Sequence, residues 1–211
     1  MKKILVVQLA VILVFSAGFI GMLAGTDVYE EIHDNIVNVL CLSCLKLDSK
    51  TELSYTNQTA TGEAIPEFLI ENLSKGPILL HYSQDVCHGC EIMLPVIQNI
   101  TDLDYGKKDT VSTEISFKGG TYTYYYINND HAPDHLADTY ELFDVAGIGA
   151  RPMFVLITYD CQGADCQTEI VYSSQIGVLG GDSYQEQYAY VETMMEEALS
   201  MWENYHEDYQ G

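Results

Sequence analysis

The chain has 211 residues, of which 31 are acidic and nine basic, and its formal net charge is −22. This charge excludes binding to phosphate backbones through counterion release, so we expect no nucleic-acid partner. Hydrophobic residues make up 47% of the chain and glycine and proline are ordinary in number, which excludes a disordered or collagen-like protein. About 185 residues follow an apolar N-terminal stretch, enough for one globular domain.

Residues 1–26 are predicted to form a transmembrane anchor. The uncharged run between Lys3 and Asp27 is long enough to cross a bilayer of about 30 Å, whereas the apolar core of a signal peptide has about 7–15 residues. An uncleaved or cleaved signal is the alternative, because small residues lie within the run. Lys2 and Lys3 precede it and acidic residues follow, so the positive-inside rule predicts a single-pass cell-membrane protein with an extracytoplasmic C-terminal domain.

Residues 27–62 are expected to be a stalk helix and linker. Apolar residues recur at helical spacing after Val28, and the helix is predicted to end near Cys41 and Cys44. The polar stretch 49–62 is expected to be a loop, which joins the stalk to a domain spanning 63–211.

Helices and strands are predicted to alternate along this domain, which then closes with a hairpin and a helix. The glycine at position 76 ends the first helix, and Pro95 is expected to kink the second. In chain order we expect a helix within 64–76, a strand at 77–83, a helix at 90–100, a hairpin of 110–117 and 121–128, a helix at 133–145, a hairpin of 153–160 and 168–174, and a helix at 184–205.

The six cysteines form three close pairs: Cys41/Cys44, Cys87/Cys90 and Cys161/Cys166. In an oxidising compartment an even number of cysteines favours disulfides or a working dithiol. The second pair, a C-x-x-C, lies between the predicted strand 77–83 and the helix that follows it.

From about residue 65 to residue 205 the chain resembles the thioredoxin superfamily. The resemblance is carried by "ILLHYSQDVCHGCEIMLPVI", by "YYYINND", by "VAGIGARPMFVLI" and by "SSQIGVLGGDSYQEQYAYVETMM". It implies an α/β fold with a thioredoxin-like central mixed sheet flanked by helices, here preceded by an N-terminal transmembrane helix.

The resemblance implies that Cys87 is the exposed nucleophile and Cys90 the buried resolving thiol. A cysteine at a helix N-terminus has its thiolate stabilised by free N–H groups and the helix dipole, which lowers its pKa from about 8.5 towards 3.5–7.5. Protonated His88 would favour that thiolate further; alternatively, it is only a polar residue at the surface. His-Gly departs from the dipeptides that the family more often has between its cysteines.

Three further residues match positions of the family. His81 stands where a buried acid often assists the resolving thiol, so it is a candidate acceptor for the Cys90 proton, or a core histidine paired with a backbone carbonyl. Pro152 matches the cis-proline, which faces the dithiol and leaves the preceding backbone free to pair with a substrate strand. Arg151 would steer acidic substrates, stabilise the thiolate or form a surface salt bridge.

The remaining cysteines leave several interpretations open. Cys161 and Cys166 are expected to form a disulfide that closes a short loop. Cys41 and Cys44 are a second redox dithiol, a structural disulfide or a pair of metal ligands. Two C-x-x-C pairs also match a zinc site, which export and the sequence context disfavour.

The predicted function is that of a membrane-anchored thiol–disulfide oxidoreductase. It would act on extracytoplasmic protein thiols and disulfides through the Cys87-His-Gly-Cys90 dithiol, with an unidentified redox partner and no dissociable cofactor. The alternatives are a copper- or metal-handling carrier and a non-catalytic adaptor, both thioredoxin-like. Whether the protein oxidises, reduces or isomerises is left open, because about 30 mV corresponds to only about 1.4 kcal/mol.

Overall fold

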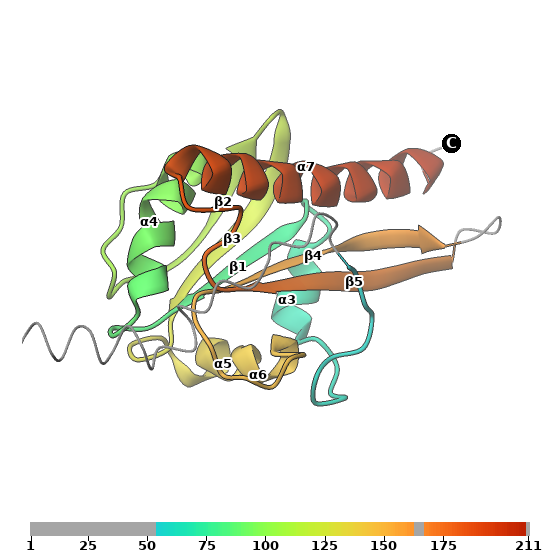
Figure 1. Ribbon diagram of the computed structural model, residues 1–211. Coiled ribbons are helices and arrows are strands. Elements are labelled where there is room, and N and C mark those ends of the chain that lie inside the picture. Colours follow the sequence, from blue (N-terminus) through green and yellow to red (C-terminus); the bar gives the residue numbers. More distant parts are fainter. Residues whose placement is uncertain (1–53, 163–166, 210–211) are drawn as a thin grey trace, which may run out of the picture. The chain divides into compact units, whose positions relative to one another are not determined.

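The computed structural model describes residues 54–162 and 167–209, which belong to the unit Leu42–Gly211 (Figure 1). The predicted anchor, most of the stalk and three cysteines (Cys41, Cys44 and Cys166) lie outside the described residues. Within the described part, no helix combines the length and the apolar character needed to cross a membrane.

Five strands and five helices are described, in the alternating order that the sequence predicts. They are α3 (Glu67–Asn72), β1 (Ile78–Ser83), α4 (His88–Thr101), β2 (Thr110–Phe117), β3 (Gly120–Asn128), α5 (Asp134–Ala137), α6 (Thr139–Phe143), β4 (Met153–Gln162), β5 (Gln167–Ile176) and α7 (Tyr184–Tyr209). Both predicted hairpins are present, as β2 with β3 and β4 with β5.

The strands form one mixed sheet in the order β2-β3-β1-β4-β5. The central strand β1 runs parallel to β3 and antiparallel to β4, so that His81 lies opposite Tyr126 on one side and Phe154 on the other. The predicted α/β class, with a mixed sheet flanked by helices, is confirmed.

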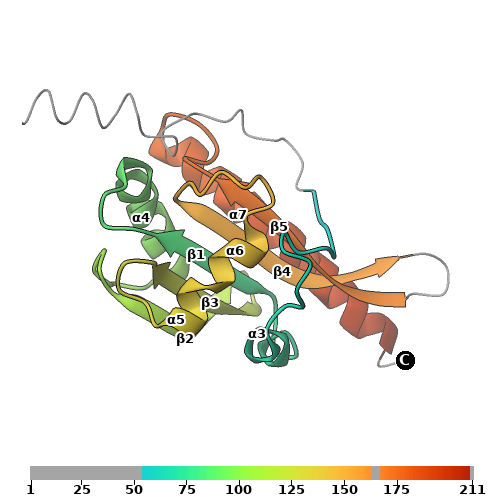
Figure 2. The ribbon, with the colours of Figure 1, turned by 90° about the horizontal axis from the view of Figure 1, so that it is seen from below.

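Helices cover both faces of the sheet: α4 and α7 lie on one face, and α3, α5 and α6 on the other (Figures 1 and 2). Alternation along β1 supplies both cores, since Leu79 packs under α4 and α7 while Leu80 packs with the other three helices. All six residues of β1 are buried, which is why this strand reads as a short continuous apolar run rather than an alternating one.

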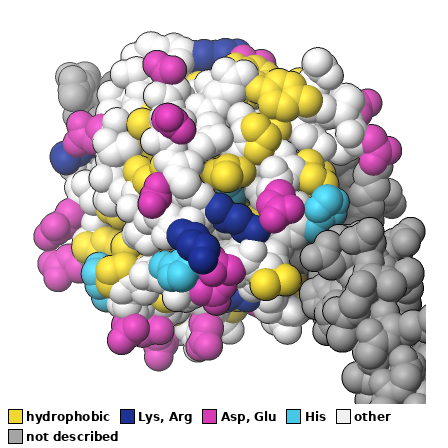
Figure 3. All heavy atoms as spheres, turned by 90° about the vertical axis from the view of Figure 1, so that its left-hand side faces the viewer, with side chains coloured by type: hydrophobic (Ala, Val, Ile, Leu, Met, Phe, Trp, Pro, Cys, Tyr) yellow, Lys and Arg dark blue, Asp and Glu magenta, His cyan; other side chains and the backbone are white. Residues whose placement is uncertain are grey.

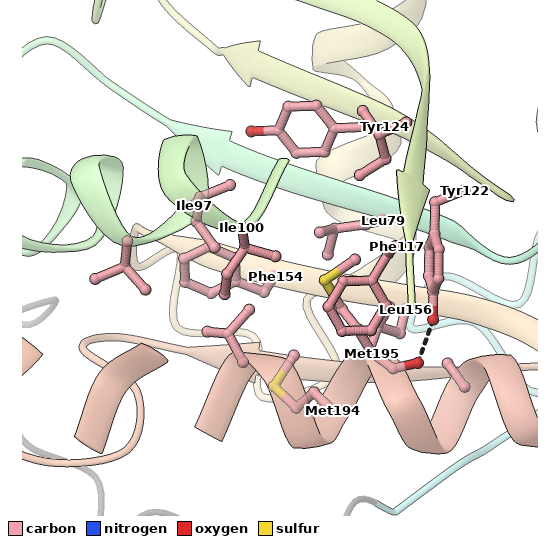
Figure 4. Packing of buried hydrophobic residues seen from close by; sticks show 14 of the residues in the cluster. Leu79, Ile97, Ile100, Phe117, Tyr122, Tyr124, Phe154, Leu156, Met194 and Met195 are labelled. Atoms are coloured by element: carbon pink, nitrogen blue, oxygen red, sulfur yellow. Dashed lines mark hydrogen bonds between the residues drawn. The ribbon is translucent and has the colours of Figure 1, made fainter. Parts of the chain in front are cut away.

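The core beneath α4 and α7 joins residues from distant parts of the chain (Figure 4). Leu79 from β1, Ile97 from α4 and Phe154 from β4 are completely buried there, together with Met195 from α7. The Tyr122 hydroxyl donates a hydrogen bond to the Met195 carbonyl oxygen, so the hairpin β2–β3 is fixed to the C-terminal helix.

The structure differs from the sequence prediction at 133–145, where two short helices replace one. Thr139, the first residue of α6, bonds through its hydroxyl to the Leu136 carbonyl at 2.5 Å and to the Tyr82 hydroxyl at 2.7 Å. Side-chain bonds of this kind compete with a continuous helix. The helix α4, in contrast, is one continuous helix that includes Pro95. The loop 54–62 pairs with the sheet through an isolated β-bridge between Thr56 and Tyr172.

Gly76, between α3 and β1, lies against the backbone of β3. Its φ is +158°, and a Cβ at this position would lie 1.8 Å from the Thr121 carbonyl oxygen. The next residue, Pro77, accepts a hydrogen bond at its carbonyl oxygen from the Thr123 N–H, at 3.0 Å. The close approach therefore places the start of β1 in register with β3.

We predict that Gly76→Ala destabilises the protein by about 2–4 kcal/mol, because backbone must move to make room for the methyl group. Gly62→Ala is the matched control: its φ is +77° but no atom lies within 4 Å of the added Cβ, so it should cost only about 1–2 kcal/mol. Urea unfolding of the full-length chain measures both. Equal losses in the two variants would contradict the close approach.

Candidate functional site

Cys87 and Cys90 lie where β1 leads into α4, and a disulfide joins them across a Cα–Cα distance of 5.2 Å. Cys87 is the N-cap residue of this 14-residue helix: its backbone is extended, with φ −148° and ψ 101°, and its Sγ accepts the N–H of Cys90 at 3.1 Å. The Cys87 sulfur thus occupies the position in which unpaired N–H groups and the helix dipole stabilise a negative charge.

Both cysteines are almost fully covered, with exposed fractions of 3% for Cys87 and 2% for Cys90. The sequence predicts an exposed Cys87, but in this disulfide form the residue is buried. The physical reason is the cap itself, because an N-cap side chain turns back over the first helical turn to reach its N–H groups. The neighbouring side chains are open to solvent: Val86 is 69% exposed and the His88 side chain 54%.

His88 faces a carboxylate on its own helix. Its Nδ1 lies 3.8 Å from a Glu91 oxygen, and the Lys107 ammonium bonds the other Glu91 oxygen at 2.7 Å. The hydrogen bond from Lys107 is the main cause that holds the Glu91 pKa below its ordinary value, so this group is a carboxylate at neutral pH. An exposed ion pair of this kind is weak, and the effect of His88 on the thiolate stays a prediction.

His81 is completely buried on the sheet face that α4 covers. Its ring stacks on Phe154 with a centroid distance of 4.6 Å and contacts the ring of Tyr126 at 5.0 Å. Nδ1 lies 3.2 Å from the Tyr124 hydroxyl, so the partner is a side chain and not the backbone carbonyl that the sequence suggested. Nε2 has no hydrogen-bond partner among the described residues.

Burial lowers the pKa of His81 to about 3. The imidazole is therefore neutral at physiological pH, and it holds a proton weakly in this disulfide form, whereas an effective general base has a pKa near the working pH. The role of His81 as acceptor of the Cys90 proton stays a prediction, and this environment works against it.

The segment between β1 and Cys87 is held by residues that sequence reasoning did not identify. The Asp85 N–H donates to Asp130 at 2.7 Å, and the Asp85 carboxylate accepts from Asn128 at 3.1 Å and lies 3.0 Å from His131 Nε2. The signal was present, since "NNDH" begins with Asn128, the last residue of the strand that runs parallel to β1. Parallel strands bring their carboxyl ends to the same sheet edge.

The loop before β4 approaches the same edge. The peptide bond between Arg151 and Pro152 is cis, and Tyr82, near the end of β1, pairs with Met153. The buried Asp144 organises this loop, because its carboxylate accepts the N–H of Gly149 at 2.7 Å and that of Ile148 at 3.4 Å. The sequence did not identify Asp144 as a structural residue, because the N–H groups of Ile148 and Gly149 reach its carboxylate only when the loop folds back.

The structure therefore brings Cys87, Cys90, His88 and Pro152 to one edge of the sheet, with His81 inside the core near the end of β1. Figure 3 views the molecule from the side where β1 ends and α4 begins, and basic side chains lie near the middle of the described surface, beside hydrophobic ones. The predicted loop disulfide is not described, since Cys166 and the Cys161 side chain lie outside the described residues.

No protein-family model matches the chain, and no curated protein matches it either. Among the described residues, no three His, Cys, Asp or Glu side chains are grouped closely enough to hold a metal ion. A functional assignment must therefore come from the residues and their geometry.

We predict that His81 makes folding stability depend on pH. Its pKa is about 3 in the folded chain and about 6.5 in an unfolded one, so between these values the unfolded state binds more protons and stability falls as the pH falls. Wild type should lose up to about 1.4 kcal/mol per pH unit more than His81→Phe in this range.

Urea unfolding of both proteins at pH 7.5, 6, 5 and 4 measures this difference. His81 stacks on Phe154, and a phenyl ring at position 81 should preserve an aromatic contact there, which makes His81→Phe a suitable comparison even if its absolute stability changes. Parallel curves for the two proteins would show that His81 is protonated equally in the folded and unfolded states.

Proposed function

We propose that this chain is a thiol–disulfide oxidoreductase with a thioredoxin-like fold, anchored in the membrane by residues 1–26 and acting outside the cytoplasm. The observation that supports it best is the cap of α4: the helix begins at the dithiol, and the Cys87 sulfur accepts the Cys90 N–H. A thiolate formed at Cys87 keeps that hydrogen bond and the helix dipole, so it is a good leaving group and a reactive nucleophile near neutral pH.

The exchange needs no dissociable cofactor. A substrate thiolate attacks the Cys87 sulfur, the Cys87–Cys90 bond breaks, and Cys90 leaves as a thiolate that takes up a proton. A second thiolate of the substrate then attacks the substrate sulfur of the mixed disulfide and releases Cys87. The substrate loses two electrons and the Cys87–Cys90 disulfide gains them, becoming a dithiol; in the reverse direction Cys87 attacks and Cys90 resolves.

The neighbourhood of the dithiol supports docking of an extended protein segment. Among the described residues, no hydrogen bond involves the backbone N–H or C=O of Arg151, and the resemblance implies that a substrate strand pairs at this position. Exposed apolar side chains lie on both adjoining segments, Val86 before α4 and Val145 and Ile148 in the loop before β4. Protein thiols and disulfides are thus the proposed substrates.

We predict that the Cys87–Cys90 disulfide is reduced reversibly to a dithiol as a two-electron couple. The full-length chain is equilibrated in glutathione and dithiothreitol buffers, alkylated and mapped by mass for each cysteine pair. A potential near about −120 mV would identify a disulfide donor and one near about −270 mV a reductant. If the pair never titrates, or retains stoichiometric Cu(I), the oxidoreductase proposal fails and an adaptor or metal carrier replaces it.

The roles of the two cysteines predict opposite results for matched variants. Cys90→Ser should accumulate a mixed disulfide with a cysteine-containing peptide, because Cys87 reacts and nothing resolves the product. Cys87→Ser, which removes the sulfur at the cap, should trap none. Non-reducing mass analysis after alkylation shows both, and equal trapping by the two variants would contradict the assignment of Cys87 as nucleophile.

His88 is predicted to raise the reduction potential slightly. Its protonated form stabilises the Cys87 thiolate and hence the reduced state, so His88→Gln should make the potential more negative, by about 20 mV or less because the side chain is exposed. His135→Gln is the control, since His135 is also exposed but packs against Phe68 of α3. If His135→Gln changes the reduction potential as much as His88→Gln does, His88 has no specific effect on the dithiol.

A further inference from the structure

Arg151 is the only arginine in the sequence, and in the described part of the chain it is the one Lys or Arg side chain with no carboxylate within 4.0 Å. The described lysines, in contrast, are all paired with acids: Lys75 with Glu114, Lys107 with Glu91, Lys108 with Asp85, and Lys118 with Glu192 and Glu196. In a chain with 31 acidic residues, an unpaired cation beside the dithiol requires an explanation.

The surroundings of Arg151 hold its guanidinium in place without neutralising it. The central guanidinium carbon lies 3.7 Å from the centre of the Tyr140 ring, and the Tyr140 hydroxyl donates to the Ala150 carbonyl at 2.8 Å. Burial raises the pKa of Tyr140 to about 12, so the ring is neutral. The nearby Asp144 carboxylate is committed to the N–H groups of Ile148 and Gly149.

Most hydrogen-bonding capacity of Arg151 is unused. A guanidinium carries five N–H donors, and among the described residues only one bond is made, from Nη1 to the Gly149 carbonyl at 2.7 Å. Nε is buried and likewise has no hydrogen-bond partner in the described part of the chain. A stacked, planar fork with free donors is the arrangement that binds a carboxylate with two parallel hydrogen bonds.

We propose that Arg151 is a specificity residue that binds the carboxylate of an acidic side chain next to the reacting cysteine of the substrate. This inference rests on the proposed oxidoreductase function, since it places Arg151 beside the disulfide that the substrate attacks. The location follows from the sheet: Met153 pairs with Tyr82, so Arg151, two residues earlier, lies beside the segment that leads from β1 to Cys87. The substrates are therefore proteins with an acidic residue adjacent to a thiol.

Because the protein carries a large negative net charge, a preference for an acidic peptide would identify a local contact. With a charge of −22, the protein as a whole repels acidic peptides and attracts basic ones. A preference for an acidic peptide over its amide counterpart therefore has to come from a local contact, and it should remain when salt screens the long-range repulsion.

The experiment compares three reduced peptides, each with two cysteines and with Glu, Gln or Lys beside the first. Each is mixed with the full-length chain in its Cys87–Cys90 disulfide form, with detergent for the apolar N-terminus, and loss of the protein disulfide is followed by alkylation and mass. Rates are divided by the rate of the same peptide with glutathione disulfide, which removes differences in intrinsic thiol reactivity. The result for each protein is the Glu/Gln rate ratio.

For wild type we expect a Glu/Gln ratio of about ten, which corresponds to about 1.4 kcal/mol. Arg151→Gln should bring the ratio below one, because only the repulsion by the net charge remains, and Arg151→Lys should retain part of the preference, since it keeps the charge but not the fork. Each ratio is internal to one protein, so a change in overall reactivity or stability does not affect it.

Two results would overturn the inference while leaving the proposed function intact: a wild-type ratio of one or less, or the same ratio in wild type and Arg151→Gln. If the Cys87–Cys90 disulfide reacts neither with dithiothreitol nor with any peptide, the proposed function itself fails and the inference falls with it.

Discussion

The complete burial of β1 is the constraint on which the site depends. The strand lies between a parallel and an antiparallel neighbour and is covered by helices on both faces. Because β3 runs with it and β4 against it, the carboxyl ends of β1 and β3 and the amino end of β4 meet at one edge. The dithiol, the polar loop after β3 and the loop that precedes β4 are neighbours for this reason, although 60 or more residues separate Cys90 from Pro152.

Most ionised side chains at this edge are neutralised by a partner, so the helix N-terminus contributes strongly to its electrostatics. His81 is neutral, and Lys107 and Lys108 are paired with acids. Desolvation raises the pKa of Asp85, but its hydrogen bonds with Asn128 and His131 outweigh that cost and lower it, so the carboxylate anchors the loop in its charged form. The N-terminus of α4 and the guanidinium of Arg151, which has no ion-pair partner among the described residues, are left as the local sources of positive potential near Cys87.

Sequence reasoning predicts elements whose cause is local and fails where the cause is distant. The buried run of β1, the two hairpins and the helix after Cys87 follow from apolar patterning and turn residues. The break between α5 and α6 depends on a bond from Thr139 to Tyr82, 57 residues away, and the cover over Cys87 depends on cap geometry. The bond to Tyr82 has no signal in the residues of its own segment, whereas the cover over Cys87 has a local cause, the backbone conformation of the N-cap, which residue types alone do not give.

The burial of Cys87 and Cys90, together with the exposed side chains of the loops beside them, bears on which thiols could react with the disulfide. Cys87, a residue with 3% exposure, offers little to a passing thiol, so in the proposed exchange a productive partner must first contact the groups around it. These are apolar at Val86 and Ile148 and cationic at Arg151, so under the proposed function they would favour segments that combine hydrophobic and acidic side chains over those with either alone. In the proposed exchange, contact with three separate groups would also fix the orientation of the attacking sulfur, which matters because the attacking, central and leaving sulfur atoms must approach a line.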